Sequence, residues 1–214
     1  MSPFPADLID GYRTFRQTDY VTDAARYRHL AERGQKPSTL VIACSDSRVD
    51  PSRIFNAGPG ELFVVRNVAN LVPPCEDGRG YHGTSAAIEF AVEGLEVTRI
   101  LVMGHGQCGG VRAFLADAGR RKSAQTFVEK WISLLGPAYE ALRADGIPDD
   151  PDALQNRLEQ VAVAHSIANL MTFPFIQKAI ADERLVLIGG FFDIYSGRLQ
   201  FLDSKNGRFE AVAA

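Results

Sequence analysis

Two short apolar segments, each followed at once by a turn rich in potential metal ligands, constrain what this chain can fold into. Residues 40–42 (Leu-Val-Ile) lead into Ala-Cys-Ser-Asp-Ser-Arg, and residues 100–103 (Ile-Leu-Val-Met) lead into Gly-His-Gly-Gln-Cys-Gly-Gly. Short β-branched runs bounded by glycine, proline or serine are typical of strands buried on both faces of a sheet. The pattern therefore predicts two buried strands whose carboxyl ends carry the polar turns.

The potential ligands are Cys44 in the first turn and His105 and Cys108 in the second. Parallel α/β sheets place their sites beyond the carboxyl ends of the strands, so these side chains converge if the two strands are neighbours. Two thiolates and one imidazole suit zinc, and three protein ligands leave the fourth coordination position open for chemistry. Cysteine is also common as a small buried hydrophobe, so these three residues alone fit ordinary core positions equally well.

Asp46 and Arg48 follow Cys44 by two and four residues. Arg48 can hold Asp46 through two parallel hydrogen bonds and keep it ionised. The alternative is an ordinary salt bridge that fixes the turn. We favour a catalytic pair, because a carboxylate this close to a metal-binding thiolate is electrostatically unfavourable unless it has a role of its own.

The rest of the chain predicts an α/β fold with a mainly parallel central sheet of about four to five strands flanked by helices. Beyond the first run, strands are expected at residues 61–68, 98–104, 184–189 and 198–202, and helices at 83–95, 111–118, 123–143, 151–171 and from Pro174 onward. Residues 3–34 have apolar side chains at helical spacing, interrupted near 17–19. We expect one domain, 1–214, made of a helical arm (1–34) and a zinc-binding core (35–214).

Composition excludes several classes of partner. The net charge of −3 is spread over both halves of the chain, which argues against nucleic acid. No apolar stretch approaches the length of a membrane span, and the start lacks the features of a secretory signal. Three cysteines are an odd number, which argues for a reducing compartment, here the cytoplasm. Cys75, which follows two prolines, is expected to be a bystander thiol.

Taken together, the two motifs resemble those of the β-class carbonic anhydrases, whose hallmarks are Cys-x-Asp-x-Arg and, later, His-x-x-Cys. The similarity extends through residues 63–70 and 85–92 and covers the chain from about residue 35 to residue 202. The chain is most similar to the branch that includes the plant chloroplast enzymes. The resemblance implies a carbonic anhydrase (carbonate dehydratase, a lyase) with one Zn²⁺ per subunit. Such an enzyme hydrates CO2 reversibly to bicarbonate and a proton, by attack of zinc-bound hydroxide that an Asp-Arg pair orients.

The resemblance also implies a substrate pocket. Gln35 would polarise the substrate oxygen, the backbone N–H of Gly109 would be a further donor, and Phe63 and Val68 would form the apolar wall. In the family, the glutamine and the aromatic wall come from the neighbouring subunit. A homodimer, or a larger homo-oligomer built from dimers, is therefore implied.

The chain departs from the family pattern at two places. One branch binds bicarbonate in a second, inhibitory pocket that needs a tryptophan and a tyrosine, where this chain has Val41 and Phe192; only Arg66 of that pocket is present. Arg66 could equally be a structural ion-pair partner. The plant-like members carry a tyrosine and a histidine where this chain has Phe90 and Gly94, so neither residue here can relay a proton.

Two other functions compete with carbonic anhydrase. A hydrolase of carbon disulfide or carbonyl sulfide uses the same fold and the same zinc. A non-catalytic zinc-binding scaffold protein usually lacks a ligand or the Asp-Arg pair, and this chain has all five residues. Carbonic anhydrase is therefore the favoured function.

Overall fold

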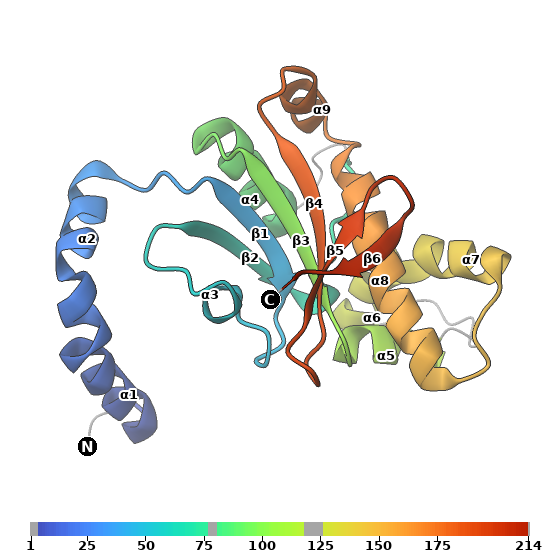
Figure 1. Cartoon of the computed structure of the whole chain (residues 1–214), viewed down its shortest axis with the longest axis horizontal. Coiled ribbons are helices and arrows are strands. Elements are labelled where there is room, and N and C mark those ends of the chain that lie inside the picture. The colour runs from blue at the N-terminus through green and yellow to red at the C-terminus, as the bar shows by residue number, and fades with distance from the viewer. Residues whose placement is uncertain (1–3, 77–80, 118–125, 214) are drawn as a thin grey trace.

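The computed structural model describes residues 4–76, 81–117 and 126–213 (Figure 1). These residues form a six-stranded sheet in the order β2-β1-β3-β4-β5-β6. The strands are β1 (Thr39–Cys44), β2 (Leu62–Asn67), β3 (Arg99–His105), β4 (Val186–Phe192), β5 (Leu199–Asp203) and β6 (Arg208–Ala211). The first four in spatial order are parallel to one another, whereas β5 and β6 are antiparallel additions at one edge. The predicted α/β fold with a mainly parallel sheet is confirmed.

The sheet of the described residues has one strand more than the four to five predicted. The extra strand is β6, which forms a hairpin with β5. Only Phe209 in β6 is partly buried, and its ring packs edge-on against Phe191 with the centroids 5.8 Å apart. A four-residue edge strand with one inward side chain has no alternation long enough to be recognised in the sequence.

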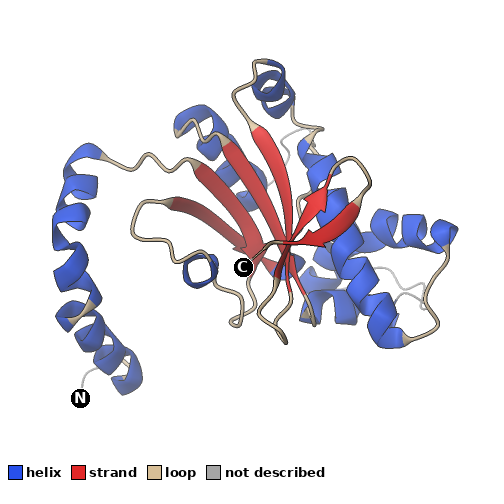
Figure 2. Ribbon diagram, in the orientation of Figure 1, coloured by secondary structure: helices blue, strands red, loops and turns tan. Residues whose placement is uncertain are grey.

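Strand β1 lies between β2 and β3 and is buried on both faces, as its continuous apolar run predicts. Leu40 and Ile42 belong to a core cluster to which the flanking helices contribute. Val41 and Ala43 belong to a smaller cluster with Met103 of β3. The helices that contribute to the first cluster are α4 (Gly83–Glu89), α8 (Pro151–Leu170) and α9 (Pro174–Ala181), seen beside the red strands in Figure 2.

Most predicted helices are present, but two of them are broken. The helix from Gly83 continues as a π-helical turn at Phe90–Gly94. The stretch expected at 123–143 forms α6 (Phe127–Ile132), a 3-10 turn (Ser133–Leu135) and α7 (Gly136–Asp145). Pro137, which fits only the first turn of a helix, explains the new start. Helix α5 (Gly109–Asp117) follows the second motif; residues 118 and 123–125 of the predicted helices lie outside the described residues.

The N-terminal arm consists of α1 (Ala6–Gln17) and α2 (Asp19–Arg33), and the break at Thr18 confirms the predicted interruption. Figure 1 shows the arm standing apart from the sheet. Arg26 attaches it to the core, because its guanidinium donates to the Pro59 carbonyl at 2.6 Å and pairs with Glu61 at 2.9 Å. Neither arm helix has a buried side chain among the described residues, and Leu8 and Tyr12 are 55% and 60% exposed.

Candidate metal centre

Cys44, His105 and Cys108 meet at the carboxyl edge of the sheet. Cys44 is the last residue of β1 and His105 the last of β3, and these two strands are parallel neighbours. Cys108 follows a tight turn in which Gln107 has the left-handed φ of +59°. All three side chains are buried, and their ligand atoms lie within 4.8 Å of one another. The predicted convergence is therefore present in the fold.

The imidazole of His105 is oriented for a ligand. Its Nδ1 lies 2.8 Å from the carbonyl oxygen of Gly106, which can only accept a hydrogen bond, so Nδ1 carries the proton. The other nitrogen, Nε2, is buried and has no hydrogen-bond partner in the described part of the chain. A buried ring nitrogen without a partner, beside two thiols, fits a metal ion.

The two thiols lie with their Sγ atoms 4.0 Å apart. The hydrogen bond from Cys108, assisted by His105, lowers the pKa of Cys44 well below that of an ordinary thiol. The same contact and burial raise the pKa of Cys108. Burial opposes the charged form of His105, but the Cys44 thiolate and the Gly106 carbonyl outweigh it and raise the pKa of His105. The group thus holds protons that a divalent cation would displace, as expected of a Cys-His-Cys zinc site.

Asp46 and Arg48 form the predicted bidentate pair. Arg48 donates from Nε to Asp46 Oδ1 at 2.9 Å and from Nη2 to Oδ2 at 2.7 Å. Its Nη2 also donates to the carbonyl of Gln107 at 3.0 Å, which ties the first motif to the second. The guanidinium holds the pKa of Asp46 well below its usual range, so this carboxylate is ionised at neutral pH.

Arg66 on β2 is both an ion-pair partner and a neighbour of the site. Its Nη1 pairs with Asp50 Oδ2 at 3.1 Å, and Asp50 in turn caps the short helix α3 (Pro51–Ile54). Its Nε donates to the carbonyl of Cys44 at 2.9 Å, and its Nη2 to that of Asp46 at 2.6 Å. Arg66 therefore fixes the backbone of the first motif.

Two residues of α8 border the candidate metal centre, and the sequence analysis did not identify either of them as a site residue. Glu159 accepts a hydrogen bond from the backbone N–H of Cys108, and Gln155 donates to Glu159. Burial raises the pKa of Glu159. The only available signal was a pair of polar residues four positions apart on a helix, which is common on exposed helix faces.

The structure brings two of the four predicted substrate-pocket residues to the centre. Gly109 follows Cys108 directly. Val68 lies against the residue after that, because a Cβ on Gly110 would lie 2.8 Å from Val68 Cγ1. Phe63 pairs with Leu40, four positions before the end of β1, and is therefore about 13 Å along the strand from Cys44. Gln35 is exposed in the segment before β1. A single chain does not place Gln35 or Phe63 beside the ligands.

The remaining candidates lie outside the ligand group. Cys75 is an exposed free thiol, and all three cysteines are free. His165 is half-buried on α8, where burial lowers its pKa. His82 lines a cavity of about 620 Å³ that Val68 and Trp131 also line.

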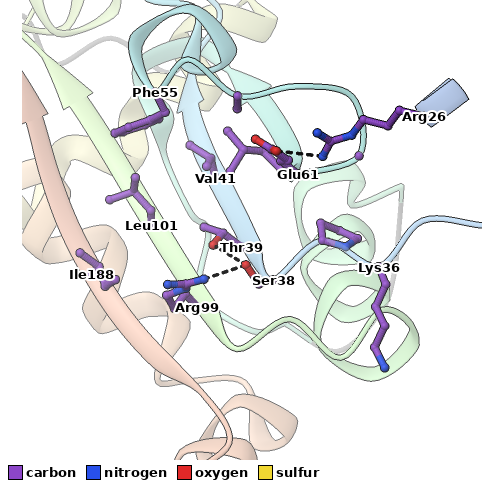
Figure 3. A pocket seen from close by; sticks show the side chains of 14 residues that line it. Arg26, Lys36, Ser38, Thr39, Val41, Phe55, Glu61, Arg99, Leu101 and Ile188 are labelled. Atoms are coloured by element: carbon purple, nitrogen blue, oxygen red, sulfur yellow. Dashed lines mark hydrogen bonds and ion pairs between the residues drawn. The ribbon is translucent and has the colours of Figure 1, made fainter. Parts of the chain in front are cut away.

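A second cavity, of about 580 Å³, opens between the arm and the amino-terminal half of the sheet (Figure 3). Leu101 and Ile188 supply apolar side chains to it, and Arg26 and Glu61 lie on the side of the arm. No metal-centre residue lines it.

Comparison with known proteins gives consistent matches. A family model described as carbonic anhydrase matches residues 39–199. Beta carbonic anhydrase 5, chloroplastic, from Arabidopsis thaliana is 37% identical over 189 residues, which are 87% of this chain and 61% of that protein. The chain thus spans less than two thirds of the length of this relative.

Solved structures match over nearly the whole chain. The β-carbonic anhydrase CcaA has a TM-score of 0.82 at 29% identity, covering 97% of this chain and 92% of that one. A structure from a study of two tetrameric β-carbonic anhydrases of Sordaria macrospora has a TM-score of 0.79 at 31% identity, covering 96% and 97%.

Proposed function

Because this chain belongs to the β-class carbonic anhydrases, we propose that it hydrates CO2 reversibly to bicarbonate and a proton, with one Zn²⁺ per subunit. The observation that supports this most directly is the meeting of a Cys-His-Cys group with an Asp-Arg pair at one edge of the sheet. Cys44, His105 and Cys108 would hold the metal through Sγ, Nε2 and Sγ. Bound zinc supplies Lewis acidity, which generates a nucleophile from water at neutral pH.

Asp46 and Arg48 orient the reacting water oxygen. The Asp46 carboxylate is ionised and so can only accept; it takes the hydrogen bond of the O–H group and turns the oxygen lone pair toward the carbon of CO2. Arg48 fixes both carboxylate oxygens and, through the Gln107 carbonyl, keeps the pair in register with the ligand turn. This arrangement exists before substrate arrives, which is what makes such electrostatic contacts effective.

The substrate-facing roles follow from position. The backbone N–H of Gly109 is proposed to donate to a substrate oxygen, since this residue opens α5 directly after Cys108. Val68 is proposed as an apolar wall, because it lies against the first turn of α5. CO2 is small and apolar, so one donor and a dry wall suffice to hold it.

We further propose a homodimer in which the partner supplies Gln35 and Phe63. Each chain would form one domain, residues 1–214, made of the arm (1–34) and the zinc-binding core (35–214). The arm leaves Leu8 and Tyr12 exposed, and the cavity of Figure 3 leaves Leu101 and Ile188 accessible on the sheet. Apolar surface of this kind on both parts of one chain is typical of an interface. The tetrameric Sordaria relatives are compatible with larger assemblies built from dimers.

The cytoplasm is our proposed compartment, because all three thiols are free and two of them belong to the metal centre. The Arabidopsis relative is chloroplastic by name, so fractionation of the source cells has to test this. In the described ranges, no helix has the length and apolarity needed to cross a bilayer.

The proposed function is tested by zinc analysis together with stopped-flow CO2 hydration on one pure sample. We expect about one zinc per chain and hydration that is lost when the metal is removed. Faster turnover of carbon disulfide or carbonyl sulfide than of CO2 would contradict the proposal in favour of the related hydrolases. Full zinc content without turnover of any of the three substrates would indicate a scaffold protein.

A further inference from the structure

Helix α8 presents two buried polar side chains to the ligand turn. Glu159 is 3% exposed and Gln155 is 5% exposed, although both residue types usually face solvent. The helix can approach this closely because β3 has no side chain at Gly104, where a Cβ would lie 2.6 Å from Val163 Cγ2 and 3.5 Å from the Glu159 carbonyl. Burying such groups is costly unless they are hydrogen-bonded, so their partners matter.

Their hydrogen-bond partners include the backbone N–H and carbonyl of Cys108, one of the proposed metal ligands. Glu159 Oε1 accepts from the N–H of Cys108 at 2.7 Å and from Gln155 Nε2 at 2.8 Å. Gln155 Nε2 also lies 3.4 Å from the carbonyl of Cys108. Arg112 donates to Gln155 Oε1 at 3.2 Å and to Gln107 Oε1 at 2.7 Å. The two polar backbone groups of Cys108 are thus both held from α8.

Cys108 needs this support because the preceding residue is strained. Gln107 has a φ of +59°, a conformation that a residue with a side chain rarely adopts. The direction of the Cys108 Cα–Cβ bond depends on the two peptide groups beside it. Glu159 also keeps a cost of its own, because its Oε2 is buried without a partner in the described part of the chain. An apolar side chain would fill the same space without burying an unpaired oxygen, so packing alone does not explain a glutamate here.

We propose that Glu159 is a positioning residue for the metal centre: its carboxylate holds the backbone N–H of Cys108 so that the thiolate points at the metal. This inference rests on the proposed zinc-binding function. Residues that orient metal ligands typically change metal affinity by about 10- to 100-fold when they are replaced.

The test compares zinc affinities of purified variants by competition with a chromophoric chelator. Glu159→Leu keeps the size of the side chain and removes the acceptor, and it should weaken Zn²⁺ binding by about 10- to 100-fold. Glu159→Gln keeps an acceptor oxygen and should restore most of the affinity. Cobalt-loaded Glu159→Leu should also show an altered thiolate-to-cobalt absorption band, which reports ligand geometry.

Ser166→Ala is the matched control. Ser166 is buried on the same helix and accepts from the backbone N–H of Val72 at 3.3 Å, away from the ligands. It should lower the unfolding temperature but leave zinc affinity and the cobalt spectrum unchanged. If Glu159→Leu does not fold, Gln155→Leu carries the test with the same expected direction.

Wild-type zinc affinity and cobalt spectrum in Glu159→Leu would overturn the inference. Equal loss of affinity in Ser166→Ala would also overturn it, since the effect would then be one of general stability. Because affinity is measured without CO2, a wild-type protein that binds zinc and does not hydrate CO2 would refute the proposed function alone.

Discussion

Asp46 accepts two hydrogen bonds from the side chain of Arg48 and lies two residues after Cys44. We predict that Asp46→Asn keeps its zinc, because the three proposed metal ligands are untouched. Its turnover should fall by about 100- to 1,000-fold, the typical loss for one catalytic electrostatic contact (~2.7–4 kcal/mol). Stopped-flow hydration and metal content on the same sample check this. Near-normal hydration at full zinc content would refute the role of the pair.

The ligand set can be tested with three single cysteine variants. Cys44→Ser and Cys108→Ser should lose zinc and activity together, because a hydroxyl is a poor substitute for a thiolate on zinc. Cys75→Ser is the internal control, since this thiol is exposed and outside the ligand group. It should retain both zinc and activity. Loss of zinc from Cys75→Ser alone would mean that the ligand assignment is wrong.

At the scale of single residues, the sequence predicts what is local and misses what depends on packing. Cys44, Asp46 and Arg48 share one turn, so their spacing alone indicated a joint role. Glu159 lies 51 positions from Cys108 and reaches it only because α8 packs on β3 at Gly104. Nothing in the neighbourhood of Glu159 in the chain indicates that contact.

The packing of α8 on β3 leads to a prediction about stability. Gly104→Ala would place a Cβ 2.6 Å from Val163 Cγ2, so the Val163 side chain or helix α8 has to shift. We expect a loss of about 1–3 kcal/mol in the free energy of unfolding, as for overpacked cores. Urea unfolding measures this loss. Zinc affinity should fall as well if the helix shifts, because Glu159 lies on the same helix.

The Gly104→Ala prediction has two controls: the same substitution at another glycine, and a second substitution that removes the clash. Gly136→Ala should not destabilise the protein, since a Cβ there meets no other atom within 4 Å. Val163→Ala combined with Gly104→Ala should recover part of the lost stability, because it removes the clashing methyl group. A double variant less stable than the sum of its single changes would contradict the proposed clash.

Among the elements, the buried parallel strands and the long helices were predictable, and the irregular ones were not. Strands β1 and β3 are continuous apolar runs, which have few alternative structures. Strand β6 has too little apolar sequence to be recognised. The π-helical turn after α4 lies within residues 83–95, whose apolar spacing predicts one continuous helix. The break at Thr18 was predictable because the helical spacing of apolar residues changes there.

For the whole molecule, the N-terminal arm is the feature whose exposed apolar side chains a single chain does not explain. It has no buried side chain in its two helices, as far as the structure describes them. We predict that deleting residues 1–30 weakens self-association and activity in parallel, because the partner would no longer be held where it supplies Gln35 and Phe63. Light scattering and CO2 hydration at matched concentrations check this. A fully active monomer would refute the shared site.

Sequence alone predicts such assembly only through resemblance, because an interface does not require a local motif. Phe63 illustrates this: within one chain it lies about 13 Å from Cys44 along the strand, too far to line the same site. Its ring packs against Phe90, with the centroids 5.8 Å apart. The pair therefore forms one aromatic surface that is separate from the ligands of its own chain.

That aromatic surface also bears on how the proton leaves after each turnover. Phe90 is 53% exposed and has no hydroxyl, and Gly94 has no side chain that could carry a proton. A Cβ on Gly94 would lie 3.3 Å from the Phe90 ring, so a histidine there would have to displace it. His165 is half-buried on α8, and burial disfavours its charged form. His82 lines the cavity that Val68 also lines, so it is the first histidine to test as a relay.

We predict that proton release depends on external buffer. Histidine is the usual proton carrier near neutral pH, and none of the histidines outside the ligand group belongs to a motif that places it at the metal. Turnover at saturating CO2 should therefore rise with imidazole concentration, while the second-order constant kcat/KM stays nearly constant because it reports steps before proton release. Phe90→Tyr should reduce the dependence on imidazole, because it adds a hydroxyl beside Phe63, which is proposed to line the site of the partner subunit. Turnover that is independent of buffer would mean that an internal relay exists, and loss of that independence in His82→Ala would identify the residue.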